Sequence, residues 1–208
     1  MVIDLNKEFN NLLLKIDTTN KPNLFLHVCY GPCSSGVLYR LVSSFNIYII
    51  FYNSNIDSLI EFYLRLYELK YYLSKSSYNF NIIYEKYNHK DFLEYVHGLE
   101  NEPEGGRRCE KCFELRLKES FSISKNYINS HNLINDKNYL CSTLSVSPHK
   151  NAELIYQIGC KVCEGSVLEY LPSDFKKQDG YLKSINVSKQ IGLYRQNYCG
   201  CEFSKCIN

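Results

Sequence analysis

The stretch NLFLHVCYGPCSSGVLYRL, residues 23–41, decides the fold class of this chain. Residues 23–28 form a short apolar run, which predicts a buried strand, and the run breaks at Gly31-Pro32. Residues 33–41 then predict a helix. A strand that passes through a tight turn directly into a helix is typical of an α/β fold.

Strand and helix patterns continue to alternate along the chain. Runs rich in β-branched and aromatic residues predict further strands, and segments of helical periodicity lie between them. The predicted strands are residues 45–52, 80–84, 139–146 and, more weakly, 167–171, and the predicted helices are residues 61–74, 91–97 and 152–163. We expect an α/β fold in which a mainly parallel sheet is flanked by helices, with a Rossmann-like or PP-loop-like core and a cysteine-bearing C-terminal segment. Because no internal repeat or obvious linker interrupts the sequence, residues 1–208 are expected to form a single α/β domain.

The composition indicates an ordinary globular protein. Of the 208 residues, 45% are hydrophobic and 22% are charged, and a net charge of +2 indicates no particular class of partner. Residues 1–7 lack the features of a secretory signal, and no run of about 18 uncharged apolar residues is present. We therefore expect a cytoplasmic protein with no membrane partner, in a reducing compartment where persistent structural disulfides are rare.

Ten cysteines are the most informative chemical feature of the sequence. Six of them form three close pairs, at Cys29/Cys33, Cys109/Cys112 and Cys199/Cys201. Disulfide scaffolds are typical of short secreted chains, whereas this chain is long enough to bury a core of its own. Paired thiols in a reducing compartment indicate metal ligands or redox catalysts.

The first pair, Cys29 and Cys33, surrounds the turn that follows the first predicted strand. Ligands of open α/β sheets gather outside the carboxyl ends of the strands. The unpaired N–H groups and the dipole at the start of a helix favour anionic sulfur, so thiolates are plausible here. The alternative is that both cysteines are small apolar residues that fill the joint between strand and helix.

The second pair is the C-x-x-C of Cys109 and Cys112, preceded by Arg107 and Arg108 and interrupted by Lys111. We expect these cations to stabilise thiolates. A single C-x-x-C fits zinc, iron–sulfur or dithiol chemistry equally well. It becomes specific only when further thiols arrive from elsewhere in the chain, because a cluster or a closed zinc site needs three or four of them.

The third pair, Cys199 and Cys201, flanks Gly200. A C-G-C segment is a poor metal clamp, but it can close into a strained and easily reduced disulfide ring, and glycine provides the backbone freedom for this ring. The other cysteines are expected to be packing or surface residues, and they are Cys141, Cys160, Cys163 and Cys206.

Taken together, five segments resemble the QueH family of epoxyqueuosine reductases, which is unrelated to the cobalamin-dependent enzyme of the same step. They are LHVCYGPCS (26–34), GLENEPEGGRRCEKCFELRL (98–117), TLSVSPHKN (143–151), DFKK (174–177) and GLYRQNYCGC (192–201). The matches occur in order from about residue 22 to residue 204, and they are specific jointly rather than singly.

The resemblance implies the last step of queuosine synthesis, in which epoxyqueuosine at the wobble position of tRNA is reduced to queuosine. Members of this family are iron–sulfur proteins, which implies a [4Fe-4S] cluster and, as a further option, an additional mononuclear iron. The implied partners are a tRNA anticodon loop that carries epoxyqueuosine and an electron donor that the sequence does not identify. Carried over by position, Cys29, Cys109 and Cys112 resemble the cluster ligands, and Cys33 is placed at the metal centre. Cys199 and Cys201 resemble the redox-active disulfide.

One position departs from the family pattern. The family usually reads Cys-Cys-Gly-Pro-Cys, whereas this chain has Tyr30 in place of the second cysteine. Either Cys33 or another group completes the site, or one iron stays open, or the metal site is weakened. A Tyr30 phenolate would be an unusual replacement, because the unperturbed pKa of tyrosine is about 10.

The implied reaction also needs a proton donor, since the epoxide oxygen leaves as water. We hypothesise that an open iron acts as a Lewis acid on this oxygen. Asp174, Glu110 and His149 lie in family-like segments and are candidate acids, and Asp174 is the preferred one because its carboxylate could also ligate iron. Each of them could instead be a surface group or a cap.

Basic and aromatic side chains near the cysteine segments are candidates for contact with single-stranded RNA. They are Arg107, Arg108, Lys176, Lys177, Tyr194 and Arg195. The alternative is a solvated face whose charges are balanced by neighbouring glutamates.

Two other classes of protein fit part of this pattern. A zinc-binding structural or RNA-interaction module would use Cys29, Cys109, Cys112 and a fourth ligand, but it would leave the C-G-C segment without a role. A PP-loop-like sulfur-transfer or adenylating enzyme would need a Ser-Gly-Gly-x-Asp-Ser-like loop, and the turn at residues 30–36 offers too few free backbone donors after Pro32.

Overall fold

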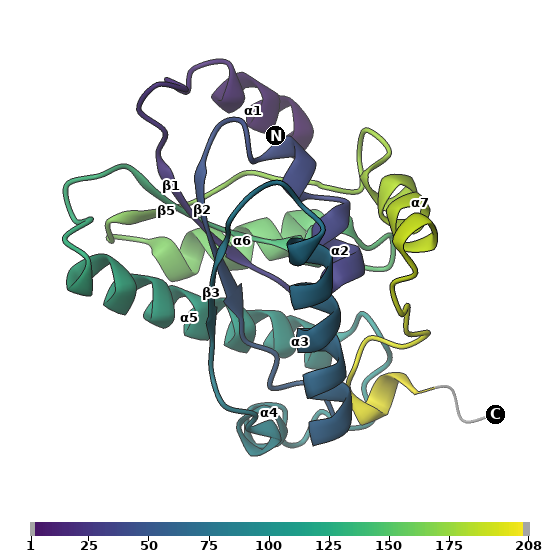
Figure 1. Ribbon diagram of the computed structural model, residues 1–208. Helices are drawn as coiled ribbons and strands as arrows, with labels where there is room; N and C mark the ends of the chain where they lie inside the picture. The colour runs from purple at the N-terminus through teal and green to yellow at the C-terminus, as the bar shows by residue number, and fades with distance from the viewer. Residues whose placement is uncertain (1–2, 206–208) are drawn as a thin grey trace.

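The structure of the protein is a computed structural model that describes residues 3–205. Five parallel strands form one sheet in the order β3-β2-β1-β4-β5, which confirms the predicted α/β class (Figure 1). The strands are β1 Asn23–His27, β2 Asn46–Phe51, β3 Asn81–Tyr84, β4 Asn138–Ser142 and β5 Leu168–Tyr170. The helices are α1 Leu5–Leu13, α2 Gly31–Ser35, α3 Leu59–Ser74, α4 His89–Tyr95, α5 Arg107–Ser130, α6 Ala152–Cys163 and α7 Gly180–Ile191. Three 3-10 turns complete the regular structure, at Leu38–Arg40, Thr143–Val146 and Glu202–Ser204.

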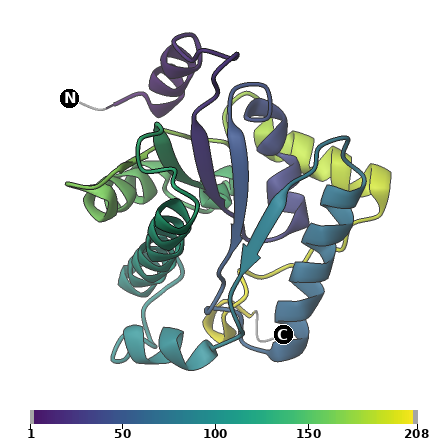
Figure 2. The ribbon, with the colours of Figure 1, turned by 60° about the vertical axis from the view of Figure 1, so that its left-hand side comes forward.

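The sheet lies between two layers of helices (Figure 2). Helices α1, α2, α3 and α7 cover one face, and α4, α5 and α6 cover the other. The central strands β1 and β4 are buried along their whole length, which explains why their residues read as continuous apolar runs. Among the described helices, none is long and apolar enough to span a membrane.

The strand order changes direction between β1 and β4, although all strands are parallel. Strands β1, β2 and β3 follow one another towards one edge, and β4 then pairs with the opposite side of β1. The crevice outside the carboxyl ends of two such strands is the usual place for a ligand in open α/β sheets. Cys29 follows β1, and the turn that begins at Thr143 follows β4.

Two predicted elements differ in detail from the structure. The strand predicted for residues 139–146 ends at Ser142, because the next four residues form a 3-10 turn that is capped by the Ser142 hydroxyl, which accepts a hydrogen bond from Leu144 N–H. The helix predicted for residues 33–41 is split into α2 and a separate 3-10 turn, and Gly36 lies between them. Both changes occur at the carboxyl edge of the sheet, next to the cysteines.

Three helices were not predicted from the sequence. Helix α1 has an ordinary amphipathic pattern and is capped by the Asp4 carboxylate, so a signal was present. Helix α5 buries two arginines and several serines beside its apolar residues, which weakens the hydrophobic periodicity. Helix α7 fully buries only Gly180, Ser184 and Ser188, while its apolar residues Ile185, Val187 and Ile191 are half-buried, so its most buried positions carry no apolar signal.

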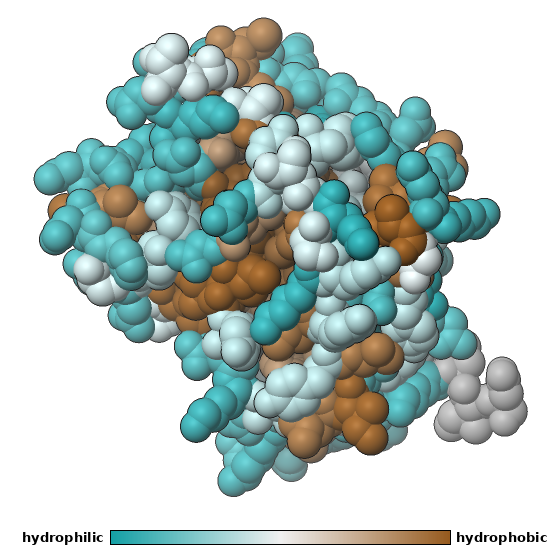
Figure 3. Space-filling view, viewed as in Figure 1, coloured by the Kyte–Doolittle hydropathy of each residue, from teal (hydrophilic) through white to brown (hydrophobic). Residues whose placement is uncertain are grey.

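The space-filling view shows a mostly hydrophilic face with apolar side chains gathered where α3 begins (Figure 3). Leu59 and Ile60 lie at this end of α3 and are 51% and 84% exposed. Further along the same helix, Phe62 and Leu66 are buried in the core, so α3 carries apolar side chains on its inner face and at its exposed start.

Candidate active site

The first cysteine pair lies in the turn between β1 and α2, as predicted. Gly31 is required at this turn, because a Cβ atom there would lie 2.6 Å from the carbonyl oxygen of Glu68 in α3. The backbone N–H of Cys29 donates to the Thr143 hydroxyl at 3.2 Å, which ties the end of β1 to the turn after β4. Cys29 is buried and Cys33 is half-buried.

Arg116 of α5 binds the Cys29 sulfur directly. Its Nη2 atom lies 3.1 Å from Cys29 Sγ and also donates to the Asn53 side chain. A hydrogen bond from Cys33 and the charge of Arg116 hold the pKa of Cys29 well below its ordinary value, although burial opposes this shift. The same hydrogen bond raises the pKa of Cys33. The pair therefore consists of a Cys29 thiolate and a Cys33 thiol that donates to it.

The second pair lies in the first turn of α5. Gly105 N–H donates to Cys109 Sγ at 3.3 Å. Burial raises the pKa of Cys109 and raises the pKa of Cys112 to about 12, so neighbouring cations do not turn these thiols into thiolates in this state, contrary to the sequence interpretation. The guanidinium of Arg108 is buried, and it donates hydrogen bonds to the backbone carbonyls of Leu99, Glu100 and Glu102 rather than to the thiols.

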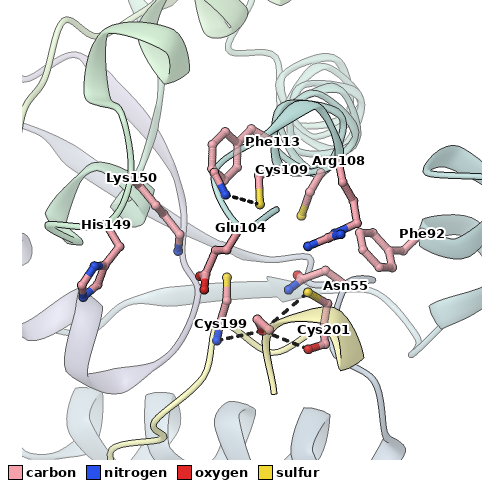
Figure 4. Close-up of a pocket in the computed structure, with 13 residues that line it drawn as sticks. Asn55, Phe92, Glu104, Arg108, Cys109, Phe113, His149, Lys150, Cys199 and Cys201 are labelled. Carbon is pink, nitrogen blue, oxygen red and sulfur yellow. Dashed lines mark hydrogen bonds between the residues drawn. The ribbon is translucent and has the colours of Figure 1, made fainter. Parts of the chain in front are cut away.

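The third pair lies in the segment after α7, and its two cysteines are free thiols. Ser204 accepts a hydrogen bond from Cys199 N–H at 3.2 Å and donates to the Cys201 carbonyl at 2.9 Å (Figure 4). Asp57 N–H donates to the carbonyl of Gly200 at 2.9 Å. These bonds hold the C-G-C segment against the loop that follows β2.

The three pairs border two adjoining pockets. The inner pocket has a volume of about 20 Å³ and is lined by the sulfur-bearing residues Cys109, Cys112, Cys199 and Cys201. The outer pocket has a volume of about 360 Å³ and is bordered by Cys29, Cys33 and again Cys199. Both pockets share the residues Glu104, His149, Lys150, Cys199 and Ser204. Figure 4 shows Cys109 facing Cys199 and Cys201 across the inner pocket, with Lys150 and Glu104 beside them.

Two cations accompany the thiols. Arg116 is only 2% exposed, and although burial disfavours its charge, the sulfurs of Cys29, Cys112 and Cys199 raise its pKa. Lys150 is half-buried, and the sulfurs of Cys199 and Cys29 raise its pKa to about 12 against the effect of burial. Both side chains therefore stay positively charged, and they favour anionic sulfur or an anionic group in the site.

The thiols of the site are donors of the kind that iron–sulfur groups use. Among residues 3–205, no three His, Cys, Asp or Glu side chains lie close enough together to hold one metal ion. A cluster is larger than one ion and is held by thiolates that approach it from several sides. Cys29 borders the outer pocket, and Cys109 and Cys112 border the adjoining inner pocket, so thiols from two parts of the chain approach the same region.

Tyr30, which replaces a cysteine of the family pattern, is a buried phenol. Burial and the neighbouring Cys33 raise its pKa, so a phenolate is strongly disfavoured. Its ring instead lies 5.5 Å from the guanidinium carbon of Arg65. The structure therefore gives Tyr30 a packing role beside Arg65.

The three candidate acids are placed differently. Asp174 is ion-paired with Lys176 at 2.9 Å and lines a separate pocket of about 570 Å³ beside α1, so the structure does not bring it together with the thiols. Glu110 is exposed and lines a groove between α5 and α6, away from the thiol pockets. His149 is exposed and lines both thiol pockets. A site role for Asp174 stays a prediction.

The candidate RNA-contacting residues differ in how exposed they are. Arg108 is buried and engaged with backbone carbonyls, so it presents no free charge at the surface. Arg107 and Lys177 are exposed, and Tyr194 is 39% exposed. Arg195 lines the outer pocket, where its guanidinium lies 5.9 Å from the Tyr181 ring.

The sequence interpretation missed four side chains of the site, which are Arg65, Glu104, Arg116 and Lys150. For one of these four residues, Arg116, the sequence contains a signal in its helical spacing from the cysteines. Arg116 follows Cys112 by four residues and Cys109 by seven, which places all three on one face of a helix. Recognising α5 would have revealed this cation.

An all-parallel α/β sheet with three thiol pairs and accompanying cations at its carboxyl edge defines an α/β protein with a thiol-rich site. Residues 24–206 match the family described as epoxyqueuosine reductase QueH. The chain is 35% identical over 188 residues to the epoxyqueuosine reductase QueH of Streptococcus pyogenes, an alignment that covers 88% of this chain and 71% of that protein. It is 35% identical over 190 residues to the one of Staphylococcus epidermidis, which covers 88% and 76%. It is 32% identical over 187 residues to the one of Acinetobacter baylyi, which covers 89% and 81%.

The chain therefore belongs to the epoxyqueuosine reductase QueH family. This confirms the resemblance that the five sequence segments indicated.

Proposed function

We propose that this protein is an epoxyqueuosine reductase, an oxidoreductase of queuosine biosynthesis that converts epoxyqueuosine to queuosine at the wobble position of tRNA, the last step of that synthesis. Family membership over residues 24–206 supports the reaction. The observation that carries the proposal is the meeting of all three cysteine pairs at two adjoining pockets. An activity on tRNA further implies a cytoplasmic enzyme.

The C-G-C segment supplies the electrons in this proposal. Converting an epoxide to an alkene removes one oxygen as water and consumes two electrons and two protons. Oxidation of the Cys199/Cys201 dithiol breaks two S–H bonds, forms one S–S bond and releases two electrons and two protons, which balances the reaction. An electron donor that is not identified must then reduce the disulfide again.

The other cysteines hold the cofactor in this proposal. Cys29, Cys109 and Cys112 are the ligands of a [4Fe-4S] cluster, and Cys33 belongs to the same metal centre, either as a further ligand or at an additional mononuclear iron. When bound, iron in this site would supply single electrons and Lewis acidity. Arg116 supports this assignment, because its buried charge beside Cys29 compensates the negative charge of thiolate ligands.

A proton must reach the oxygen that leaves. Asp174 remains the proposed acid, and its pocket shares Lys150 with the outer thiol pocket. His149 is the alternative, since it already borders both thiol pockets. Full activity of an Asp174→Asn variant, together with loss of activity in His149→Gln, would reassign this role to His149.

The outer pocket is the proposed entry for the modified anticodon loop. Arg195 and Tyr181 at its wall offer a cation and an aromatic ring, which are the groups that bind phosphates and stacked bases of single-stranded RNA. Arg107 and Lys177 are exposed cations elsewhere on the surface. We expect tRNA binding to weaken steeply with salt and to weaken further in an Arg195→Gln variant.

Metal analysis followed by a turnover assay tests the proposed function. Protein purified and reconstituted without oxygen is expected to contain stoichiometric iron and sulfide, and to convert epoxyqueuosine in tRNA to queuosine, as measured by mass spectrometry of nucleosides. A Cys109→Ala variant should lose both properties. Cys160→Ala is the matched control, because Cys160 belongs to a second C-x-x-C on α6 that borders neither thiol pocket. Zinc alone, or no turnover by iron-loaded protein, would refute the proposal.

A further inference from the structure

The C-G-C segment is positioned by contacts with the rest of the protein rather than by its own secondary structure. Between α7 and residue 205, the described chain contains only the short 3-10 turn Glu202–Ser204. The geometry of Cys199 and Cys201 must therefore come from the elements that surround them. The most deeply buried side chain that binds this segment is Arg65 of α3, which is 2% exposed.

Arg65 joins α3 directly to the first cysteine of the segment. Its Nε atom donates to the Glu61 carboxylate at 2.7 Å, one helical turn earlier. Its Nη1 atom donates to the carbonyl oxygen of Cys199 at 2.9 Å. Because the guanidinium is planar and is fixed at one nitrogen by Glu61, the direction of the bond to Cys199 is fixed as well.

Two tyrosine rings hold the same guanidinium. The guanidinium carbon of Arg65 lies 5.5 Å from the ring centre of Tyr30 and 5.3 Å from that of Tyr198, both within the range of cation–π attraction. Tyr30 follows Cys29 and Tyr198 precedes Cys199 in the sequence. Arg65 therefore connects the turn of the first cysteine pair to the segment of the third pair.

Gly200 brings its backbone up against this side chain. A Cβ atom at Gly200 would lie 2.9 Å from Arg65 Nη1, and the φ angle of Gly200 is +129°, which only glycine adopts readily. Arg65 thus lies close to the backbone of Gly200 and also donates a hydrogen bond to the carbonyl of the preceding residue, Cys199. Together, the close approach and the hydrogen bond determine the backbone path between the two thiols.

We infer that Arg65 is a positioning residue for the Cys199/Cys201 pair and stabilises its reduced, dithiol form. This inference rests on the proposed redox role of the pair. Arg65 binds the Cys199 carbonyl in a conformation in which the two sulfurs are not bonded, and closing the ring over Gly200 changes the backbone between the two cysteines, so we expect its contacts to favour the dithiol over the disulfide. A redox pair whose reduced form is stabilised is the stronger oxidant, and removing the stabilising contact must make the disulfide easier to form.

The test measures the dithiol–disulfide equilibrium of this pair in glutathione buffers, with the full-length protein. One glutathione disulfide oxidises the dithiol and is reduced to two glutathione thiols, so the reaction is balanced. After quenching, alkylation and trypsin digestion, mass spectrometry of the peptide 196–205 reports the pair alone. We expect Arg65→Met to shift the equilibrium about tenfold towards the disulfide, which is about 30 mV more negative. Arg65→Lys keeps the charge without the planar fork and should give a smaller shift in the same direction.

Arg40 provides the matched control. Its guanidinium carbon lies 4.7 Å from the Phe9 ring and 5.8 Å from the Phe175 ring, and it donates to oxygens of α1, so it makes the same kinds of contact away from the thiols. Arg40→Met should lower the thermal stability without changing the glutathione equilibrium. If Arg65→Met does not fold, Glu61→Gln removes the carboxylate that orients Arg65 and should shift the equilibrium in the same direction.

The outcomes separate the two proposals. The positioning inference would be overturned if the equilibrium constant of folded Arg65→Met stayed within twofold of the parent value. Where Arg65→Met does not fold, the same result in Glu61→Gln would overturn it. Either result would leave the proposed function standing. An equal shift in Arg40→Met would overturn it as well, because the effect would then follow stability alone. A parent protein that never forms the disulfide between Cys199 and Cys201 would overturn both the inference and the proposed electron source.

Discussion

Replacing Gly200 with alanine tests whether the conformation of the C-G-C segment is imposed by close packing against Arg65. Gly200 has a φ angle of +129°, and an added Cβ atom would lie 2.9 Å from Arg65 Nη1 and 3.2 Å from Asn55 Nδ2. Arg65 and Asn55 are both almost completely buried, so neither has free space into which it can move. The substitution therefore strains both the backbone and the packing.

The magnitude follows from these two contributions. A non-glycine residue in such a backbone conformation costs about 1–3 kcal/mol, and an extra methyl group in a packed site costs about 1–3 kcal/mol, which gives about 2–6 kcal/mol in total. The segment contributes no strand to the sheet, so we expect it to detach locally while the sheet stays folded. Even 2 kcal/mol raises the ratio of detached to docked segment roughly thirtyfold.

Alkylation of Cys201 measures this ratio, because Cys201 is only 7% exposed in the docked segment. With iodoacetamide in excess and the reaction followed by mass spectrometry of the peptide 196–205, we expect the rate in Gly200→Ala to rise at least about thirtyfold. Turnover of epoxyqueuosine in tRNA should fall, since the pair is no longer held beside the other thiols. Far-UV circular dichroism should stay unchanged.

Gly192→Ala is the control for the backbone contribution alone. Gly192 also has a positive φ angle, +72°, but no atom lies within 4 Å of the position that a Cβ atom would occupy. This variant should lose about 1–2 kcal/mol at the end of α7 and change Cys201 alkylation far less. Parent-like alkylation and turnover in Gly200→Ala would refute the reasoning, because close packing would then not determine the position of the thiols.

Three further predictions concern the fold and the metal site. His27 is buried between the Ser142 hydroxyl and the Tyr52 carbonyl, and burial lowers its pKa to about 3. In the unfolded chain this histidine binds its proton near pH 6.5, so its contribution to the free energy of unfolding should be fully present above pH 6.5. That contribution should decrease as the pH falls towards 3, by up to about 1.4 kcal/mol per pH unit. Urea denaturation of His27→Gln should lack this pH dependence. Gly159→Ala should destabilise the protein by about 1–3 kcal/mol in the same assay, because its Cβ atom would lie 2.4 Å from the Tyr170 ring, and unchanged stability would contradict the tight contact between α6 and β5. Tyr30→Phe should retain the full iron content after anoxic reconstitution, since burial keeps the Tyr30 phenol protonated, and a loss of iron would show that the hydroxyl is a ligand.

The strands could be predicted because their signal is local. Each of the five predicted strands corresponds to a strand of the sheet, since runs of β-branched and aromatic residues between turn residues are recognisable locally. Helices α5 and α7 could not be found in this way. They meet their neighbours through buried serines, glycine and arginines, and such contacts depend on a partner surface that the sequence pattern does not reveal.

The α/β class, the family and the three cysteine pairs can all be recognised in the sequence, because each depends on short local patterns and on the order in which those patterns occur along the chain. Only the tertiary structure decided which side chains meet these cysteines. Arg116 comes to Cys29 from 87 positions away, and Arg65 comes to Cys199 from 134 positions away, both through the topology of the sheet. Likewise, the tertiary structure separated Asp174 from the thiols and buried the Tyr30 phenol. Burial and long-range contact fix the charge states of a site, and neither can be obtained from the spacing of residues along the chain.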